Sequence, residues 1–210
     1  MRITVTLARQ LGCGGSYLGQ ALADSLQMRC LDREIVSRTA QQLELNEAEL
    51  AAREERFPSF WERMLRGISA SPPEALYQPP LSPAVSDRDL FAAETEVMKQ
   101  IAAQEDCIIV GRVASHVLPR HPGMINIFLY APLPFRIQRV LASRQAASDA
   151  EAGAIITQSD ENRKRFISQM IGTEWDKATH YHLCLDTSDL PLPETAEMLT
   201  DFVRRRTASS

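Results

Sequence analysis

A glycine-rich segment near the N-terminus constrains the fold more than any other feature of this chain. Residues 9–16 read RQLGCGGS, and residues 3–7 before them alternate apolar and threonine side chains, which predicts a strand. After the glycines, apolar residues recur at helical spacing between positions 18 and 26, which predicts a helix. A strand, a glycine-rich loop and a helix in this order open many phosphate-binding α/β domains.

The rest of the chain alternates apolar runs with helical patterns. Short apolar runs at 107–110, 124–130 and 183–185 predict further strands, of the kind that lie buried in parallel sheets. Helices are predicted over residues 33–70, 87–104, 113–118, 132–144, 155–171 and 194–205, and the prolines of residues 71–86 predict a loop or a mobile connection. This alternation predicts an α/β fold with a parallel sheet covered by helices on both faces.

Composition excludes several classes of protein. The length of 210 residues predicts a single domain, and the net charge of −4 comes with no basic tail or face, which argues against a nucleic-acid partner. No apolar run approaches the roughly 18 residues of a membrane span, no secretory signal is visible, and the cysteines form no CxxC pair. We therefore expect a cytoplasmic protein without a membrane partner. All but three of its basic residues are arginines, which suit phosphate binding but also follow from GC-rich coding.

The glycine-rich segment matches a phosphate loop only in part. Backbone N–H groups at a helix N-terminus can cradle phosphates, and the usual pattern is GxxxxGK followed by Ser or Thr. In the matching frame, arginine (Arg9) stands at the first glycine and Gly15 stands at the lysine that reaches the β- and γ-phosphates. Arg9 could lend charge from the strand side, although the spacing does not place its side chain. The alternative is a strand-to-helix turn that binds nothing.

Two further segments follow strands and therefore point to the ligand edge of the sheet. Asp32 follows Cys30 and Leu31, and it could hold a water on magnesium or an incoming hydroxyl, or instead cap a helix that begins at Arg33. Arg112 follows Gly111 at the end of an apolar run, where an arginine faces either a ligand crevice or an internal acid.

Arginines gather in a third region, toward the C-terminal half of the chain. Their charges could close on transferring phosphates, or they could form a solvated face that pairs with Glu151, Asp160 and Glu161. The residues concerned are Arg136 and Arg139, which share a helix face because they are three apart, then Arg144, Arg163, Lys164 and Arg165. The four histidines show no metal-ligand spacing.

Taken together, these segments resemble the cytidylate kinase-like family, a branch of the P-loop nucleoside-monophosphate kinases. The matching pieces are TLARQLGCGGSYLGQALADSL, CLDREIV, DCIIVGRVASHVL, FLYAPLPFRIQRV, SDENRKRF and TEWDKATHYHLCLDTSDL. The resemblance implies one P-loop kinase-like domain. Its core would comprise residues 1–40, 101–143 and 172–210, with a helical monophosphate-binding insertion at about 41–100 and a short lid region at about 144–171.

The resemblance also implies a role for each matching residue in the transfer of a phosphoryl group from ATP, with Mg²⁺, to a nucleotide acceptor, CMP or dCMP being expected. The catalytic group would be Arg139, Arg163 and Arg165, which bridge donor and acceptor phosphates, with Asp160 to orient them. Acceptor binding would fall to Asp32, Arg33 and Arg112, and Ser16 and Asp32 would lie near the metal through water. ATP would be held by Gly12, Cys13, Gly14, Gly15, Ser16 and Tyr17.

Two alternatives remain open at this point. Gly15 departs from the lysine of other monophosphate kinases, which would suit a nucleotide-binding regulatory protein that has lost catalysis. The insertion could equally select a different small-molecule acceptor. Phe57, Phe60, Trp61, Met64 and Leu65 form a helical apolar stripe, which could belong to the core or pair two copies in a homodimer.

Overall fold

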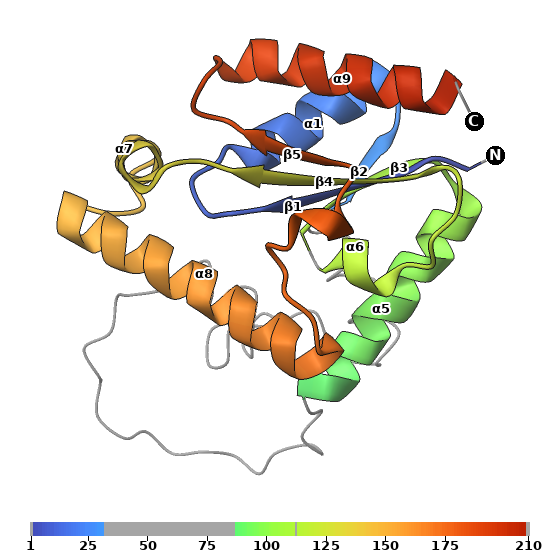
Figure 1. Cartoon of the computed structure of the whole chain (residues 1–210), viewed down its shortest axis with the longest axis horizontal. Coiled ribbons are helices and arrows are strands. Elements are labelled where there is room, and N and C mark those ends of the chain that lie inside the picture. The colour runs from blue at the N-terminus through green and yellow to red at the C-terminus, as the bar shows by residue number, and fades with distance from the viewer. Residues whose placement is uncertain (1, 32–86, 112, 209–210) are drawn as a thin grey trace, which may run out of the picture.

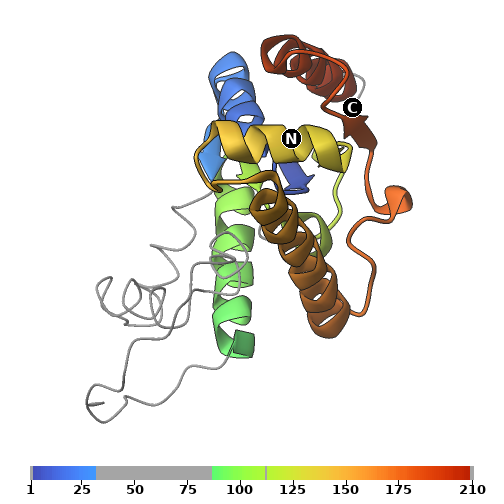
Figure 2. The same ribbon diagram turned by 90° about the vertical axis from the view of Figure 1, so that its left-hand side faces the viewer.

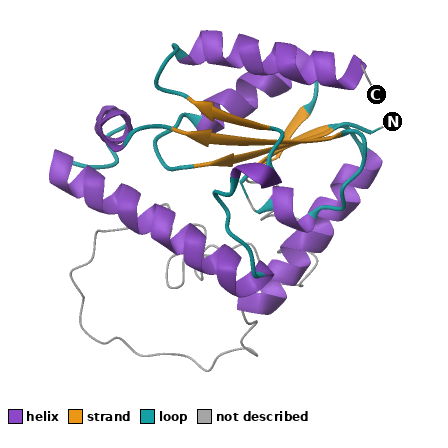
Figure 3. Cartoon of the chain, viewed as in Figure 1, coloured by secondary structure: helices purple, strands orange, loops and turns teal. Residues whose placement is uncertain are grey.

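The computed structural model of the chain describes residues 2–31, 87–111 and 113–208, and in these ranges it shows a five-stranded parallel sheet with helices on both faces (Figures 1 and 3). The strand order is β2-β3-β1-β4-β5. The strands are β1 (Thr4–Arg9), β2 (Arg29–Leu31), β3 (Cys107–Val110), β4 (Met124–Tyr130) and β5 (Leu183–Asp186). The helices are α1 (Gly15–Leu26), α5 (Asp87–Gln104), α6 (Ala114–Val117), α7 (Leu133–Ala142), α8 (Asp149–Ile171), the 3-10 turn η1 (Ala178–His180) and α9 (Leu192–Ala208).

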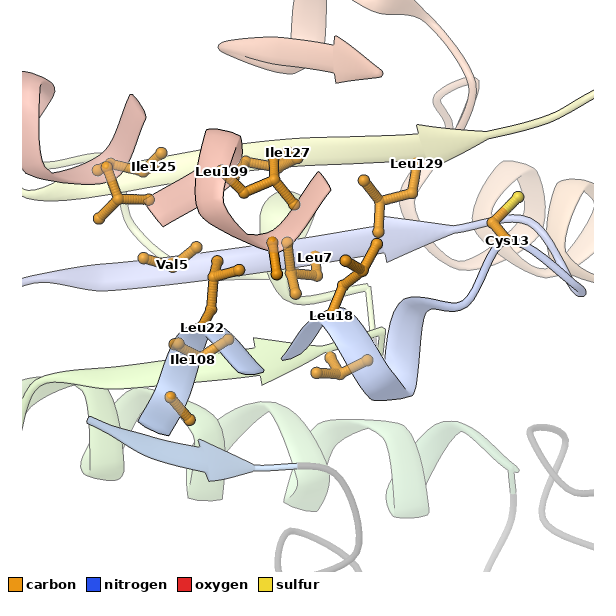
Figure 4. Close-up of a cluster of buried hydrophobic side chains, with 14 of the residues drawn as sticks. Val5, Leu7, Cys13, Leu18, Leu22, Ile108, Ile125, Ile127, Leu129 and Leu199 are labelled. Carbon is orange, nitrogen blue, oxygen red and sulfur yellow. The ribbon is translucent and has the colours of Figure 1, made fainter. Parts of the chain in front are cut away.

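The helices form two layers around the sheet. Helices α1 and α9 pack side by side on one face, and α5, α6 and α8 cover the other (Figures 1 and 2). On the first face, Val5 and Leu7 of β1 meet Leu18 and Leu22 of α1 and Leu199 of α9, all of them fully buried (Figure 4). Each such side chain contributes roughly 1.5–3 kcal/mol on burial, so this cluster fixes α1 against the sheet.

The alternation seen in the sequence places the threonines of β1 on the other face. Thr6 is buried, and its hydroxyl donates to Asn126 Oδ1 of β4 at 2.8 Å, which satisfies two polar groups inside the domain. The parallel register pairs Leu7 with Val110 of β3 and Arg9 with Leu129 of β4. The carboxyl ends of β1, β3 and β4 therefore meet at one edge. Since β3 and β4 flank β1 on opposite sides, the strand order reverses beside β1, the place where open α/β sheets bind ligands.

The predicted α/β class is confirmed, and the differences from the sequence predictions are local. Strand β1 runs on to Arg9, because Gln10 N still donates to Leu129 O of β4. Helix α8 begins at Asp149 rather than at 155: Ser148 caps its N-terminus by accepting a hydrogen bond from Glu151 N, and Gly153 is accommodated inside the helix. The helices expected over 33–70, the proline-rich segment 71–86 and Trp61 lie outside the described residues. No helix in the described ranges is long and apolar enough to cross a membrane.

Candidate functional site

The loop between β1 and α1 depends on glycine at two positions. Gly12 and Gly14 have φ of 87° and 76°, a left-handed conformation that side chains make costly. A Cβ at Gly12 would also lie 2.9 Å from Arg136 Cβ of α7, so the loop backbone packs directly on that helix. The glycines thus bring the loop close to α7 while turning the chain into α1.

The N-terminus of α1 opens onto this loop, and its own cap and first turn provide no negative charge. Gly14 is the N-cap and provides no side-chain cap, and the first turn contains no acidic residue. Ser16 and Tyr17 are exposed there. The first N–H groups of a helix lack intrahelical acceptors and carry partial positive charge, so this end is suited to an anion.

A cleft of about 500 Å³ lies in front of this helix end. Its walls come from the glycine loop, α7, the segment after α7, α8 and the start of α9. Among the described residues that line it there are three arginines and no acidic residue; the arginines are Arg9 of β1, Arg139 of α7 and Arg163 of α8. The whole chain has a net charge of −4. The concentration of positive charge in this cleft is therefore a local feature.

Arg139 is held against the loop, and one nitrogen of its guanidinium makes no hydrogen bond to the described residues. Its Cζ lies 4.7 Å from the centre of the Phe135 ring, and a Cβ on Gly14 would lie 2.6 Å from Arg139 Nη1. That Nη1 is buried and has no hydrogen-bond partner among the described residues. Burial lowers the pKa of Arg139. An unsatisfied, buried donor of this kind is stabilised when an anionic oxygen reaches it.

Arg163 is the most deeply placed of the three arginines, with 3% of its surface exposed. Its Nη1 donates to the backbone oxygen of Arg9 at 2.7 Å, and its Cζ lies 5.7 Å from the centre of the Trp175 ring. Asp160 Oδ1 is 3.7 Å away. Burial lowers the pKa of Arg163, and the neighbouring charge of Arg9 adds to this effect. These contacts fix one cation at the junction of β1 and α8.

Arg136 has a different environment from Arg139, although the two were expected to share a helix face. Arg136 is buried, and its Nη1 donates to Asp160 Oδ2 at 2.5 Å and to Leu11 O at 3.4 Å. The pair joins α7 to α8 directly beneath the glycine loop. Asp160 therefore contacts Arg136 of α7 and lies beside Arg163 of α8. It holds together the two helices that carry Arg139 and Arg163.

The structure brings most of the predicted donor-side residues together at the cleft. Gly12, Gly14, Gly15, Ser16 and Tyr17 line it. Cys13 is instead buried in the core beside the loop, and burial raises the pKa of its thiol to about 11, so only its backbone could face a ligand (Figure 4).

One further predicted residue lies away from the cleft. Arg165 is exposed on α8, two residues from the buried Arg163 and so on the opposite side of the helix. Asp32, Arg33 and Arg112 lie outside the described residues.

Several lining residues were not among the predicted site residues, and two of them bear on the site's chemistry and shape. Leu192 comes from the start of α9, and no local pattern marks it. Arg9 was noted only as a residue that could lend charge. Its sequence signal is that it stands at the first glycine of the phosphate-loop pattern.

The side chains described here do not form a metal site of their own. Within the described ranges no group of three or more His, Cys, Asp and Glu residues could hold a metal ion. Magnesium that arrives on phosphates needs few protein ligands, and a hydroxyl at the start of α1 is one of them. The exposed Ser16 fits that requirement.

Comparison with known proteins agrees with this geometry. Residues 4–189 match the model of the family described as "Cytidylate kinase-like family". A protein of Methanosarcina barkeri (strain Fusaro / DSM 804) named "Cytidylate kinase" is 24% identical over 189 residues, which cover 89% of this chain and 87% of that protein.

Solved structures show the same fold. An uncharacterized protein from Eubacterium ventriosum ATCC 27560 superposes with a TM-score of 0.69 at 16% identity, over 97% of this chain and 99% of that chain. A gluconokinase from Sinorhizobium meliloti 1021 superposes with a TM-score of 0.55 at 15% identity, over 98% of this chain and 94% of that chain. The fold is that of the P-loop kinases.

Proposed function

Because this chain belongs to the cytidylate kinase-like family, we propose that it transfers the γ-phosphoryl group of ATP to a small phosphorylated acceptor, with CMP or dCMP as that acceptor. One observation carries the proposal. Three arginines from three separate elements and the N-terminus of α1 converge on one cleft that has no acidic side chain among its described lining residues. A site of this kind favours a ligand with several negative charges, as a nucleoside triphosphate has.

The donor would lie along the glycine loop. Backbone N–H groups at the start of α1 would bind its phosphates, and the unsatisfied Nη1 of Arg139 would donate to one of their oxygens. Tyr17, which is 48% exposed at the cleft, offers a ring surface on the same side. These contacts would position the donor at the start of α1.

Transfer would take place near Arg163. This residue lines both the donor cleft and a smaller pocket formed with Gly111, Trp175 and Tyr181 on the other face of the sheet. A guanidinium that contacts donor and acceptor phosphates can neutralise charge on the transferred group. In phosphoryl transfer, catalysis consists mostly of positioning and charge neutralisation. Asp160 would keep Arg163 and Arg136 in place. Arg165, Asp32, Arg33 and Arg112 remain proposed from the resemblance alone, as do the insertion at about 41–100 and the lid region at about 144–171.

Magnesium bound with the donor would supply further positive charge to stabilise the transferred group. The Ser16 hydroxyl is the described group that would hold it, with Asp32 proposed as a second, through water. The residues of the cleft fit ATP and Mg²⁺ together, since the protein contributes cations and hydroxyls and leaves the metal to be carried by the phosphates.

The acceptor is tested by measuring ADP release from Mg–ATP with a panel of ribo- and deoxynucleoside monophosphates and a no-acceptor control. CMP or dCMP should stimulate turnover well above the other monophosphates. Arg139→Met should reduce that turnover, while the substitution Arg2→Ala, at the opposite end of β1, should not. A flat response to all monophosphates would contradict the proposed acceptor. ATP that is bound but not turned over with any acceptor would instead indicate a nucleotide-binding regulatory protein that has lost catalysis.

A further inference from the structure

The side chain of Arg9 occupies the space from which a phosphate-loop lysine would start. Gly15 is the first residue of α1 and stands where the phosphate-loop pattern has lysine. A Cβ added at Gly15 would lie 2.8 Å from Arg9 Cγ and 3.0 Å from Arg9 Cδ. Such distances are shorter than packed carbon atoms tolerate. A side chain at position 15 and Arg9 in its present path therefore exclude each other.

A second glycine makes room for the other end of the same side chain. Gly111 follows β3, has φ of +77°, and a Cβ there would lie 1.9 Å from Arg9 Nη1. Because glycine has no side chain, Gly15 leaves room for the aliphatic part of Arg9, and Gly111 leaves room for its guanidinium. The side chain runs from the end of β1, past the start of α1, to the end of β3. This is the point at which the strand order reverses and where α/β sheets bind their ligands.

The two departures from the phosphate-loop pattern are therefore physically coupled. The pattern has glycine at position 9 and lysine at position 15, and this chain has arginine at 9 and glycine at 15. Each change alone would be unfavourable. A lysine at 15 would collide with Arg9, and a glycine at both positions would remove the cation that the phosphate-loop pattern itself provides, leaving only the arginines of α7 and α8. Together they keep one cation at the loop and change the element from which it comes.

The surroundings of Arg9 favour a polyanionic ligand. Arg9 and Arg163 line both the large cleft and the smaller pocket, so they lie between the two. Arg163 also holds the backbone of Arg9 by its hydrogen bond at 2.7 Å. A phosphate that reaches this place would meet guanidinium groups from two separate elements, β1 and α8, and charge-assisted hydrogen bonds to phosphate oxygens are among the strong ones.

We propose that Arg9 provides to the donor phosphates the positive charge that other phosphate loops take from the lysine after their last glycine. This inference rests on the proposed function, because it needs ATP as the donor in the cleft. It makes Arg9 a catalytic residue that contacts the β- or γ-phosphate. It also explains how a chain with Gly15 keeps a working phosphate loop.

The test is an exchange of the two positions. Arg9→Met removes the charge and keeps an unbranched stem, and Gly15→Lys adds the usual lysine while Arg9 is still present. Arg9→Gly removes the side chain, and the double variant Arg9→Gly with Gly15→Lys restores the usual pattern. Arg2→Ala, an exposed arginine before the start of β1, is the matched control. Each protein is titrated calorimetrically with Mg–ATP and with AMP, its thermal unfolding is recorded, and its transfer rate is measured.

The inference predicts that Arg9→Met weakens Mg–ATP binding roughly 10- to 100-fold and AMP binding much less, since AMP lacks the β- and γ-phosphates. The transfer rate should fall roughly 100- to 1,000-fold. Gly15→Lys alone should also lose affinity, and the exchanged double variant should bind Mg–ATP at least about tenfold more tightly than Arg9→Gly alone, which is the non-additivity expected of coupled positions.

Two results would overturn the inference while the proposed function stands. One is an active wild-type protein whose Arg9→Met variant binds Mg–ATP as tightly as Arg2→Ala does. The other is a double variant that binds no better than Arg9→Gly. A wild-type protein that binds no Mg–ATP would overturn both the inference and the function. If Arg9→Met does not fold, Gly15→Ala replaces it. That substitution displaces the Arg9 stem without removing its charge, and unchanged Mg–ATP affinity would again contradict the inference.

Discussion

Arg163 Nη1 of α8 donates a hydrogen bond of 2.7 Å to the backbone oxygen of Arg9, the last residue of β1. This contact joins two segments that are 154 residues apart, and it sets one buried cation beside the glycine loop. The position of the transferring group would thus depend on how α8 packs on the sheet. Substitutions along α7 and α8 should consequently separate residues that act on phosphates from residues that hold the helices in place.

Replacing Arg163 should affect both stability and catalysis. Arg163→Ala leaves the Arg9 oxygen and Asp160 without this partner, so the free energy of unfolding should fall by roughly 1–3 kcal/mol. Transfer, corrected for the folded fraction, should fall at least about 100-fold. Arg163→Lys keeps the charge but loses the planar fork, and it should give an intermediate rate. Denaturant unfolding and the ADP-release assay measure the two effects, and a folded Arg163→Ala with the wild-type rate would contradict the role given to this residue.

Arg136 and Arg139 lie one helical turn apart on α7, and replacing each with methionine should affect a different property. Arg136→Met should lower stability, and Arg139→Met should lower the transfer rate. Arg136→Met leaves the partly buried Asp160 without its 2.5 Å partner and should lower the free energy of unfolding by roughly 3 kcal/mol. Arg139→Met removes a donor that has no protein partner among the described residues, so stability should change by less than about 0.5 kcal/mol while transfer falls roughly 100-fold. A stability loss in Arg139→Met as large as that in Arg136→Met would show that both are structural.

Two glycines offer a matched pair for the packing of α1 and α8. A Cβ at Gly19 would lie 2.5 Å from Val110 Cγ2, so Gly19→Ala should push α1 off β3 and lower the free energy of unfolding by roughly 1–3 kcal/mol. A Cβ at Gly153 would meet only Ile137 Cδ1, at 3.6 Å. Gly153→Ala should therefore stabilise α8 by roughly 0.5–1 kcal/mol. Thermal unfolding of the two variants should shift in opposite directions, and a shift in the same direction would contradict this account of the packing.

Stability should fall as the pH drops from about 6.5 to about 4 because of His116. Burial, followed by the charge of His180 and of Arg120, lowers the pKa of His116 from 6.5 to about 4. The unfolded chain therefore binds a proton on this ring more readily than the folded chain does, and folding loses free energy until the folded protein is protonated as well. Because the His116 ring is partly exposed, solvent screens this effect. We expect the free energy of unfolding to fall by about 2 kcal/mol, less than the pKa shift alone would give.

Denaturant titrations of wild type and His116→Gln at several pH values measure this difference. The wild-type protein should lose stability more steeply than the variant between pH 6.5 and pH 4. The pKa of His182 is also lowered by burial, so the variant should keep a smaller dependence. Equal slopes for the two proteins would show that His116 is not buried in its neutral form.

The sequence predicts β3 and β4 to the residue, because both strands are continuous apolar runs inside a parallel sheet. It misses the first six residues of α8, since the small and polar residues before 155 hide the helical period. The spacing of Ser148 and Glu151 fits a capping box and could have marked that start.

The site could be predicted from the sequence only where its residues belong to local motifs, and not where distant segments decide their placement. The glycines, Ser16, Arg139 and Arg163 could be proposed because each belongs to a local motif at the end of a strand or on an arginine-rich helix. The path of Arg9 could not, because it depends on space that Gly111 of a distant segment leaves open. Likewise, the spacing of Arg136 and Arg139 shows that they are neighbours, but only the approach of Asp160 from α8 shows which of them is ion-paired.

The most direct test of the central claim is to follow the γ-phosphate itself. Wild-type protein is incubated with Mg²⁺, CMP and ATP labelled on its γ-phosphate, and the nucleotides are separated. The account predicts that the label appears in CDP, and that its appearance is strongly reduced in Arg139→Met and unchanged in Arg2→Ala. Label that stays in ATP with CMP and with every other monophosphate would contradict a nucleoside-monophosphate kinase in this cleft.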